Sequence, residues 1–425
     1  ARADRAQLVW TLGITEHHVG TENVMALINL SLLTGHVGRY GSGLSPMRGQ
    51  NNVQGGGDMG AIPNKFPGFQ DIRSPEVRAK FEQAWGVPIQ PEYGLTLTEM
   101  CAAMDSGDLR TVYAIGENPV QSEPDTARIT KRLSNLEHFV VQDIFLTKTA
   151  QLADVVLPAA SSWCETEGTF VNSERRVQRV RKALEPPQGA RDDIDIMCDI
   201  AARLGHELHF AGSEEIWDEM RSLAPMFAGM SYARLEELGG IQWPCYSEDV
   251  LEPSYLHSRL WEDDPERRGA PAAFQVTPHK PPADTLSVEY PIRLTTGRRL
   301  DSYNTGVQSG GFASPLRHSE CIDISPEDAA ILGVGEEEPV RVTSRRASLV
   351  APAKIDKGLR QGLAFMSYHD PDLVDTNSLT IEATCPIAGT AEYKASAIRV
   401  EKMRDEERAT YQDAFDAGTV MHASA

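Results

Sequence analysis

The chain has 425 residues, enough for two or three domains, and its 61 acidic side chains against 41 basic ones give a net charge of -20. Such a negative chain has no general affinity for nucleic acid or for an anionic membrane. Its longest apolar stretch, VMALINLSLL from Val24, is far shorter than a membrane-spanning helix, so no membrane span is expected.

Six cysteines are spread along the chain, and no two form a CxxC pair. A disulfide framework or a cluster-binding motif is therefore not expected, and no histidine spacing or HExxH motif indicates a metal site. Mostly reduced thiols predict a cytoplasmic protein. The first residues, ARADRAQLVWTLG, show no initiator methionine, signal peptide or helix cap, and we expect them to be a cut inside something larger.

The first half of the chain, residues 1–238, is predicted to be an α/β domain. VWTLGIT (residues 9–15) is typical of a buried strand, and the helix that follows is capped by Thr21 and ended by Gly35. The Gly-rich segment 45–64 is predicted to be a loop, because it is too polar for a core and too rich in glycine for a helix.

Three short apolar runs organise this half. They begin at Thr111, Phe139 and Ala153 and are continuous, as strands buried on both faces of a parallel sheet should be. Helices are predicted at 97–105, 192–206 and 214–223. Parallel sheets bind ligands beyond the carboxyl ends of their strands. We therefore expect a polar ligand at the ends of these runs, beside Gly116, Glu117, Asn118, Gln142, Asp143, Leu157 and Pro158.

The second half is predicted to be a β-barrel. Between residues 239 and 290 the pattern decays into proline, acids and isolated aromatics, which indicates a connecting segment. Short alternating runs with frequent turns then predict a compact barrel over 291–403, followed by a charged helical tail over 404–425.

Two polar segments are candidates for chemistry. In SPMRGQNNVQGGGDMGAIPN (45–64), Arg48 is suited to hold a carboxylate or phosphate with two parallel hydrogen bonds, although an ordinary surface arginine explains the composition equally well. TTGRRLDSYNTG (295–306) is either a diphosphate cradle or a turn with two solvated arginines. Glu117, Asp143 and Asp193 suit a guanine edge or a ribose diol, and singly each is also explained as a cap or solvated acid. These patterns predict a nucleotide-like ligand between two lobes, but no reaction.

Longer stretches resemble a known family. PMRGQNNVQGGGDMGAIPNKFPGFQ resembles the signature loop of molybdenum- or tungsten-dependent formate dehydrogenases, which belong to the bis-molybdopterin-guanine-dinucleotide oxidoreductase superfamily. The similarity continues through YAIGENPVQSEPD, ADVVLPAASSWCETEGTFVNSERRVQ, TTGRRLDSYNTG and AEYKASAIRV, nearly end to end. It is greatest to the catalytic α subunit of soluble NAD-dependent enzymes. The fold class it implies is a parallel-sheet α/β domain followed by a six-stranded β-barrel.

The resemblance implies that the chain is the C-terminal part of a longer subunit. In the family, the N-terminal part carries iron–sulfur cysteines and the Cys or selenocysteine that ligates the metal, so no metal ligand is expected in this chain. This fragment alone is therefore expected to be inactive, and the missing N-terminal part of the subunit is an expected partner.

The resemblance also implies site residues. Arg48 matches the arginine that holds the formate carboxylate beside the metal, and Gly49 and Gln50 match residues next to the pterin. The other matches to cofactor-binding positions are Leu12, Gly13 and Glu16 after the first strand; Gly116, Glu117, Asn118, Gln142, Asp143, Ile144, Thr147 and Asp193 around one guanosine; Thr296, Arg298, Arg299, Leu300, Tyr303 and Asn304 along the diphosphates; and Asn377, Tyr393 and Lys394 on the other arm.

The implied reaction is the two-electron oxidation of formate to CO2, or its reverse, at a bis-molybdopterin guanine dinucleotide centre with Mo or W. Electrons would pass through 4Fe–4S clusters to iron–sulfur or flavin subunits and on to NAD+ or another acceptor. Three alternatives remain: another enzyme of the superfamily such as a periplasmic-type nitrate reductase, a non-catalytic relative like that in respiratory complex I, and a standalone nucleotide-binding protein.

Overall fold

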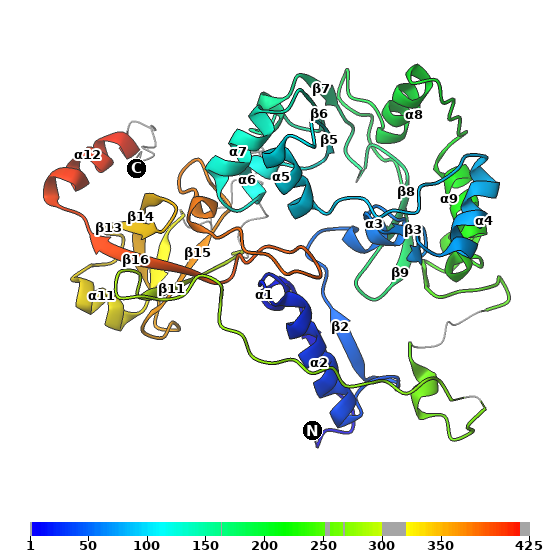
Figure 1. Cartoon of the computed structure of the whole chain (residues 1–425), viewed down its shortest axis with the longest axis horizontal. Coiled ribbons are helices and arrows are strands. Elements are labelled where there is room, and N and C mark those ends of the chain that lie inside the picture. Colours follow the sequence, from blue (N-terminus) through cyan, green and yellow to red (C-terminus); the bar gives the residue numbers. More distant parts are fainter. Residues whose placement is uncertain (1, 163, 251–255, 267, 300–319, 417–425) are drawn as a thin grey trace. The chain divides into compact units, whose positions relative to one another are not determined.

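The computed structural model describes residues 2–162, 164–250, 256–266, 268–299 and 320–416, with side chains up to Tyr411 (Figure 1). The chain folds into two compact units, each assembled from three separate segments. Unit 1 comprises Ala1–Leu12, Asn23–Thr96 and Pro158–Thr277, and unit 2 comprises Gly13–Glu22, Leu97–Leu157 and Pro278–Ala425.

The N-terminal part of unit 1 carries short strands and helices. Strands β1 (Gln7–Trp10) and β2 (Gly43–Pro46) pair in parallel. Between them lie α1 (Leu12–Thr15) and the long helix α2 (Gly20–Thr34), whose first residues belong to unit 2. After β2 come helix α3 (Val53–Asp58), the hairpin of β3 (Lys65–Phe66) and β4 (Gln70–Asp71), and helix α4 (Pro75–Trp85).

A second sheet of unit 1 forms its core. It contains β8 (Gly168–Val171), β9 (Arg176–Val180) and β10 (Ile241–Gln242), which pair antiparallel in the order β10-β9-β8. Val171 and Val177 of this sheet are buried with Trp217, Phe227 and Met230. The helices of this region are α8 (Asp193–Arg203), α9 (Ser213–Leu223), α10 (Tyr232–Glu237), η2 (Pro225–Phe227) and η3 (Ser258–Trp261).

Unit 2 begins with a small α/β sheet. Strands β5 (Thr111–Ile115), β6 (His138–Asp143) and β7 (Val155–Pro158) lie in the order β5-β6-β7, and β5 and β6 are parallel. Helix α7 (Thr126–Ser134) buries Ile129 and Leu133 in one cluster with Phe139 and Val141 of β6. The other helices here are α5 (Leu97–Ser106), α6 (Pro119–Ser122) and η1 (Ala150–Leu152).

The rest of unit 2 is a closed barrel. Its six strands are β11 (Ile292–Gly297), β12 (Ile322–Ile324), β13 (Pro339–Ser344), β14 (Ser348–Ile355), β15 (Leu363–Ser367) and β16 (Ser396–Lys402), in the order β11-β15-β12-β14-β13-β16. Alternate residues of β13 and β14 point into the buried core, as a half-buried strand requires. Helices α11 (Pro326–Leu332), η4 (Thr376–Leu379) and α12 (Asp405–Asp416) accompany it. This confirms the predicted fold class.

Three local predictions are wrong. The runs that begin at Thr111 and Ala153 form strands β5 and β7, but Ile115 is 40% and Val155 41% exposed, so these strands are not buried on both faces. The strand expected over residues 9–15 ends at Trp10, and Val9 is 59% exposed, so it is not a buried strand. The loop expected over 45–64 contains helix α3, which forms despite its three glycines because contacts with β8 hold its start and a Gln54–Asp58 hydrogen bond closes one turn. The boundaries expected at 238, 290 and 403 remain predictions.

Candidate functional site

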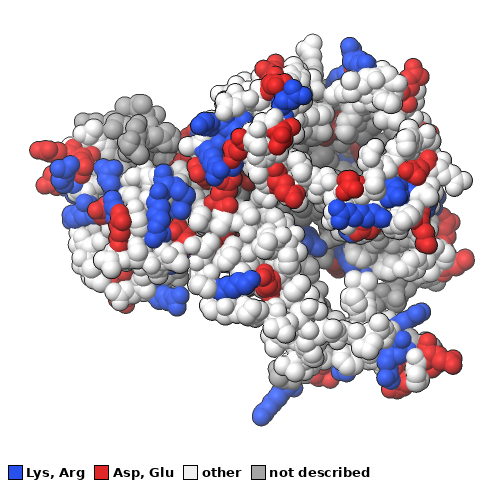
Figure 2. Space-filling view, viewed as in Figure 1, with Lys and Arg blue, Asp and Glu red and all other residues white. Residues whose placement is uncertain are grey.

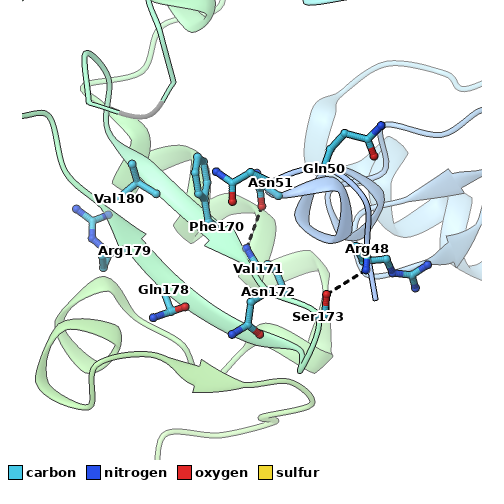
Figure 3. Close-up of a pocket in the computed structure, with 11 residues that line it drawn as sticks. Arg48, Gln50, Asn51, Phe170, Val171, Asn172, Ser173, Gln178, Arg179 and Val180 are labelled. Atoms are coloured by element: carbon cyan, nitrogen blue, oxygen red, sulfur yellow. Dashed lines mark hydrogen bonds between the residues drawn. The ribbon is translucent and has the colours of Figure 1, made fainter. Parts of the chain in front are cut away.

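A polar cavity of about 360 Å³ lies in unit 1 between the segment after β2 and the β8–β9 hairpin (Figure 3). Its volume is in the range of small-molecule binding sites. Five amide side chains and two arginines line it, and its described lining contains no acidic residue. Such a lining suits a polar ligand with many hydrogen-bond acceptors. The lining residues are Arg48, Gln50, Asn51, Asn52, Phe170, Val171, Asn172, Ser173, Gln178, Arg179 and Val180.

The hairpin fixes the backbone around Arg48. The Arg48 backbone N–H donates to the Ser173 hydroxyl at 3.1 Å (Figure 3). The Val171 N–H donates to the Asn52 side-chain oxygen at 2.9 Å. Asn52 has a left-handed backbone with φ 63. A Cβ on Gly55 would lie only 2.1 Å from Asn52 Oδ1, so this approach requires glycine at position 55.

Two buried polar residues, Gln54 and Asp58, hold the side chain of Arg48, which is itself exposed. Arg48 Nε donates to Gln54 Oε1 at 2.8 Å, and Gln54 Nε2 donates to Asp58 Oδ1 at 2.7 Å. Trp243 Nε1 donates to the other oxygen of Asp58 at 2.9 Å. The two Nη groups of Arg48 have no hydrogen-bond partner among the described residues, and the guanidinium extends away from the hairpin (Figure 3). Arg48 therefore keeps its bidentate edge available for an anion.

Asp58 is 1% exposed. Burial raises its pKa to about 6, against the hydrogen bonds from Gln54 and Trp243 and the positive charge of Arg48, which lower it. This carboxyl group therefore holds its proton to a higher pH than an ordinary aspartate does.

In unit 2, carboxyl groups gather where β5 and β6 end. Glu117 is exposed, yet the protein around its carboxyl group partly desolvates it and raises its pKa, and the charge of Asp143 raises it further. Burial likewise raises the pKa of Asp143, and it raises that of Glu123 to about 7 with a contribution from Glu117. The structure thus brings Glu117 and Asp143 to the sheet edge where the sequence predicts a ligand. Acidic acceptors at this edge suit the N–H donors of a base such as guanine.

Other predicted residues at this edge are used within the protein. Asn118 Oδ1 accepts from the Thr149 hydroxyl at 2.7 Å, and Thr147 Oγ1 accepts from the Ala150 N–H at 3.1 Å. Gln142 is fully buried and accepts from the Tyr113 hydroxyl. Ile144 is 53% exposed. A Cβ placed on Gly116 would meet nothing within 4 Å, so the space above this backbone is open to a ligand.

Asn377 and Tyr393, two predicted residues from the last segment of unit 2, contact the backbone of helix α6. Asn377 Nδ2 donates to the Gln121 carbonyl at 2.8 Å, and the Tyr393 hydroxyl donates to the Ser122 carbonyl at 3.0 Å. The Asn377 Oδ1 atom is buried without a hydrogen-bond partner among the described residues. Because buried amide oxygens are normally paired, this orphan atom fits a site completed by a ligand N–H.

Lys394 links two further predicted residues. Its Nζ donates to the Thr296 carbonyl at 3.0 Å and pairs with Glu16 at 2.8 Å. The Thr296 hydroxyl in turn donates to the Tyr393 carbonyl at 2.9 Å. Glu16, Thr296, Tyr393 and Lys394 therefore form one connected group in unit 2.

The remaining predicted residues are dispersed. Arg298 is exposed, whereas Arg299 pairs with Asp323 at 2.9 Å and its backbone N–H donates to His369 Nε2 at 2.8 Å. Leu300, Tyr303 and Asn304 lie outside the described residues. Leu12 belongs to unit 1 and Gly13 to unit 2, both in α1, and Gly49 and Gln50 follow Arg48 in unit 1. Asp193 is the first residue of α8 in unit 1.

Sequence reasoning missed the hairpin wall of the cavity. Asn172, Ser173, Gln178 and Arg179 all come from GTFVNSERRVQRV, two alternating runs around the polar turn NSER. That pattern is the available signal for a hairpin. Arg179 is fixed there by Glu167 at 2.9 Å and by the Tyr232 ring, whose centroid lies 3.2 Å from its guanidinium carbon.

Residues 2–162, 164–250, 256–266, 268–299 and 320–416 contain no group of three His, Cys, Asp or Glu side chains arranged to hold a metal ion. Within the same ranges, every helix is too short or too polar to cross a membrane. All six cysteines are free. On the face shown in Figure 2, acidic and basic side chains are interspersed.

Two family descriptions match the chain. Residues 1–203 match "Molybdopterin oxidoreductase", and residues 292–397 match "Molydopterin dinucleotide binding domain". The chain is 40% identical over 406 residues to "F420-dependent formate dehydrogenase 2 subunit alpha" of Methanococcus maripaludis, covering 94% of this chain and 59% of that protein. It is 37% identical over 420 residues to "Formate dehydrogenase H" of Escherichia coli, covering 98% of this chain and 58% of that protein.

The chain thus spans somewhat under three-fifths of the length of these relatives. Among solved structures, acetylene hydratase from Pelobacter acetylenicus is similar, with a TM-score of 0.55 and 18% sequence identity over 77% of this chain and 50% of that one. At this level of identity the likeness concerns the fold alone.

Proposed function

The chain belongs to the molybdopterin oxidoreductase family, and from this premise we propose that it acts as part of the catalytic subunit of a formate dehydrogenase. The proposed reaction is the two-electron oxidation of formate to CO2, or its reverse. Arg48 is the observation that carries this proposal: a cationic side chain, held at Nε, that keeps its bidentate edge free.

Arg48 would act by binding and orienting the substrate. Formate is a small carboxylate, and two parallel hydrogen bonds from the Nη groups would fix both its oxygens. The single C–H bond would then point in one direction, which lowers the entropic part of the barrier. Arginine also binds an anion far more strongly than neutral CO2, so the same grip would weaken as the product forms.

We propose that a bis-molybdopterin guanine dinucleotide with Mo or W is the cofactor. Its metal centre, when bound, supplies the site that accepts the two electrons. Glu117 and Asp143 would accept hydrogen bonds from a guanine edge, and Asn377 Oδ1 would gain the N–H partner that it lacks among the described residues. Thr296, Tyr393 and Lys394 would line the path of a second arm.

Partners and location follow from the same proposal. Electrons would leave through 4Fe–4S clusters to iron–sulfur or flavin subunits and then to NAD+ or another acceptor. The free thiols of all six cysteines support a location in the cytoplasm. Cell fractionation and formate-dependent reduction of NAD+, compared with an artificial dye, test these two points.

Replacing Arg48 by alanine in the full-length enzyme tests the function. We expect kcat/KM for formate, measured by dye reduction, to fall by about 100-fold or more, because both charge-assisted hydrogen bonds are lost. Molybdenum or tungsten and pterin contents should stay near wild type. Arg203→Ala, at an exposed arginine of α8, is the matched control and should change neither. Unchanged formate kinetics in a fully loaded Arg48→Ala enzyme would contradict the proposal.

A further inference from the structure

The hydrogen-bonded chain Trp243–Asp58–Gln54–Arg48 has a fixed direction. Its two middle members, Asp58 and Gln54, are buried, whereas Trp243 is half-buried and Arg48 is exposed. An indole N–H only donates, and an ionised carboxylate only accepts. Asp58 therefore accepts from Trp243 on one oxygen and from the Gln54 amide on the other. That turns the carbonyl oxygen of Gln54 toward Arg48 Nε, which donates to it. The acceptor-only carboxylate of Asp58 and the donor-only Nε–H of Arg48 thus fix the Gln54 amide from its two ends.

The direction of this chain determines how Arg48 is held. With Gln54 offering its oxygen, the guanidinium is anchored through Nε, and both Nη groups remain available. If the Gln54 amide were reversed, its NH2 group would face the Arg48 Nε–H, donor against donor, and the anchor would be lost. We propose that Asp58 is a positioning residue that, acting through Gln54, fixes the orientation in which Arg48 receives a carboxylate substrate.

The surroundings of Asp58 favour this role over a packing role. Asp58 borders a second cavity, of about 80 Å³, whose lining includes Gly55, Gly56, Trp217 and Phe227. Arg48 is the charged group that acts on it, and Arg175 stacks on the far partner, with its guanidinium carbon 5.2 Å from the centroid of the Trp243 ring. An apolar side chain could fill this buried position without the free-energy cost of desolvating a carboxylate. A charged group here is explained by what it does to Gln54.

This inference rests on the proposed function, since its readout is formate binding. The test uses the full-length holoenzyme with Asp58→Asn, which keeps the shape of the side chain and removes one acceptor. Asparagine has one acceptor oxygen and one NH2 group in place of two acceptor oxygens, so a donor group then faces either Trp243 Nε1–H or the Gln54 amide, and one of the two links at position 58 is lost. We expect KM for formate to rise about tenfold or more, with kcat within about threefold of wild type. Metal and pterin contents should be unchanged.

Three further variants make the test specific. Gln54→Met has a similar length and removes the link to Arg48, so it should reproduce the rise in KM and decides the matter if Asp58→Asn does not fold. Asp71→Asn removes a carboxylate of unit 1 that pairs with Lys65 at 2.7 Å and is not a member of this hydrogen-bonded chain, so it should leave KM unchanged. In an Arg48→Ala background, Asp58→Asn should add no further loss, because its effect passes through the arginine.

The outcomes separate this inference from the proposed function. If Arg48→Ala impairs formate oxidation but Asp58→Asn and Gln54→Met, fully loaded, keep KM within twofold of wild type, the positioning role is wrong and the function stands. The positioning role would also be wrong if Asp58→Asn raised KM for formate by the same factor in the Arg48→Ala enzyme as in the wild-type enzyme. If Arg48→Ala leaves the formate kinetics unchanged, the proposed function itself fails.

Discussion

At the scale of single residues, Asp58 is costly to the fold. Its pKa lies at about 6 instead of the ordinary 3.8, a difference of about two units or roughly 3 kcal/mol. Because the folded state holds the proton more tightly than the unfolded chain does, the protonated Asp58 contributes to the free energy of unfolding. This contribution is fully present below pH 4 and is lost as the pH rises through 6. At neutral pH the protein therefore carries an ionised carboxylate that weakens its own stability, beside the arginine proposed to bind substrate.

The same titration predicts a pH dependence of formate binding. Above pH 6, Asp58 is ionised and accepts from both partners, so Arg48 is anchored. Below pH 6 the carboxyl group gains a proton, and its O–H competes with the Arg48 Nε–H for the Gln54 oxygen, which weakens the anchor. We expect KM for formate to rise as pH falls through about 6, with kcat less affected. Steady-state kinetics between pH 5 and 8 measure this.

The control for the pH experiment is the Asp58→Asn enzyme, which has no proton to gain at this position. Its KM should be high and flat across the same range. A wild-type KM that does not change with pH, or an Asp58→Asn profile that still bends near pH 6, would contradict the assignment.

At the scale of elements, regular patterns were predictable and long-range ones were not. The alternating barrel strands, the three apolar runs of unit 2 and helix α2 follow from periodicity, and each appears in the structure. Helix α3 and the role of Asp58 depend on partners far away in sequence, since Val171 lies 119 residues from Asn52 and Trp243 lies 185 residues from Asp58. The local helix propensity of segment 45–64 does not include such contacts, so the sequence pattern predicts a loop there. The composition of segment 45–64 singled out Arg48 as a candidate but explained a surface arginine equally well, and its substrate-binding role, implied by the family resemblance, stays a prediction.

Helix α3 offers a sharp test of how this segment is held. A methyl group at Gly55 would clash with Asn52 Oδ1, the atom that accepts from Val171, while one at Gly56 would meet nothing within 4 Å. We expect Gly55→Ala to destabilise the holoenzyme by about 1–3 kcal/mol and to raise KM for formate, because the hairpin contact is lost. Gly56→Ala should be neutral or stabilising by up to about 1 kcal/mol. Thermal unfolding and formate kinetics on both variants, one residue apart, check this; equal behaviour would refute it.

At the scale of the whole molecule, unit 2 is assembled from three segments of the chain that meet around predicted ligand-binding residues. Glu16 comes from the first segment, Gln121 and Ser122 from the second, and Asn377, Tyr393 and Lys394 from the third. A ligand at these residues would therefore contribute to holding separate segments together. Binding to the folded state alone raises stability in proportion to the logarithm of ligand concentration over Kd.

Cofactor removal should therefore lower the stability of the protein. We expect full-length enzyme prepared without the pterin dinucleotide to unfold at a lower temperature than loaded enzyme, since a ligand at 100 times its Kd contributes about 2.7 kcal/mol. Asp143→Ala should shift the loaded preparation toward the empty one, with less bound guanine dinucleotide, because one acceptor at the end of β6 is lost. Asp108→Ala, at an exposed aspartate of the same unit, is the control and should retain full loading. Full loading and unchanged unfolding of Asp143→Ala would place the dinucleotide elsewhere, whereas equal unfolding temperatures of empty and loaded enzyme would mean that the segments of unit 2 hold together without it.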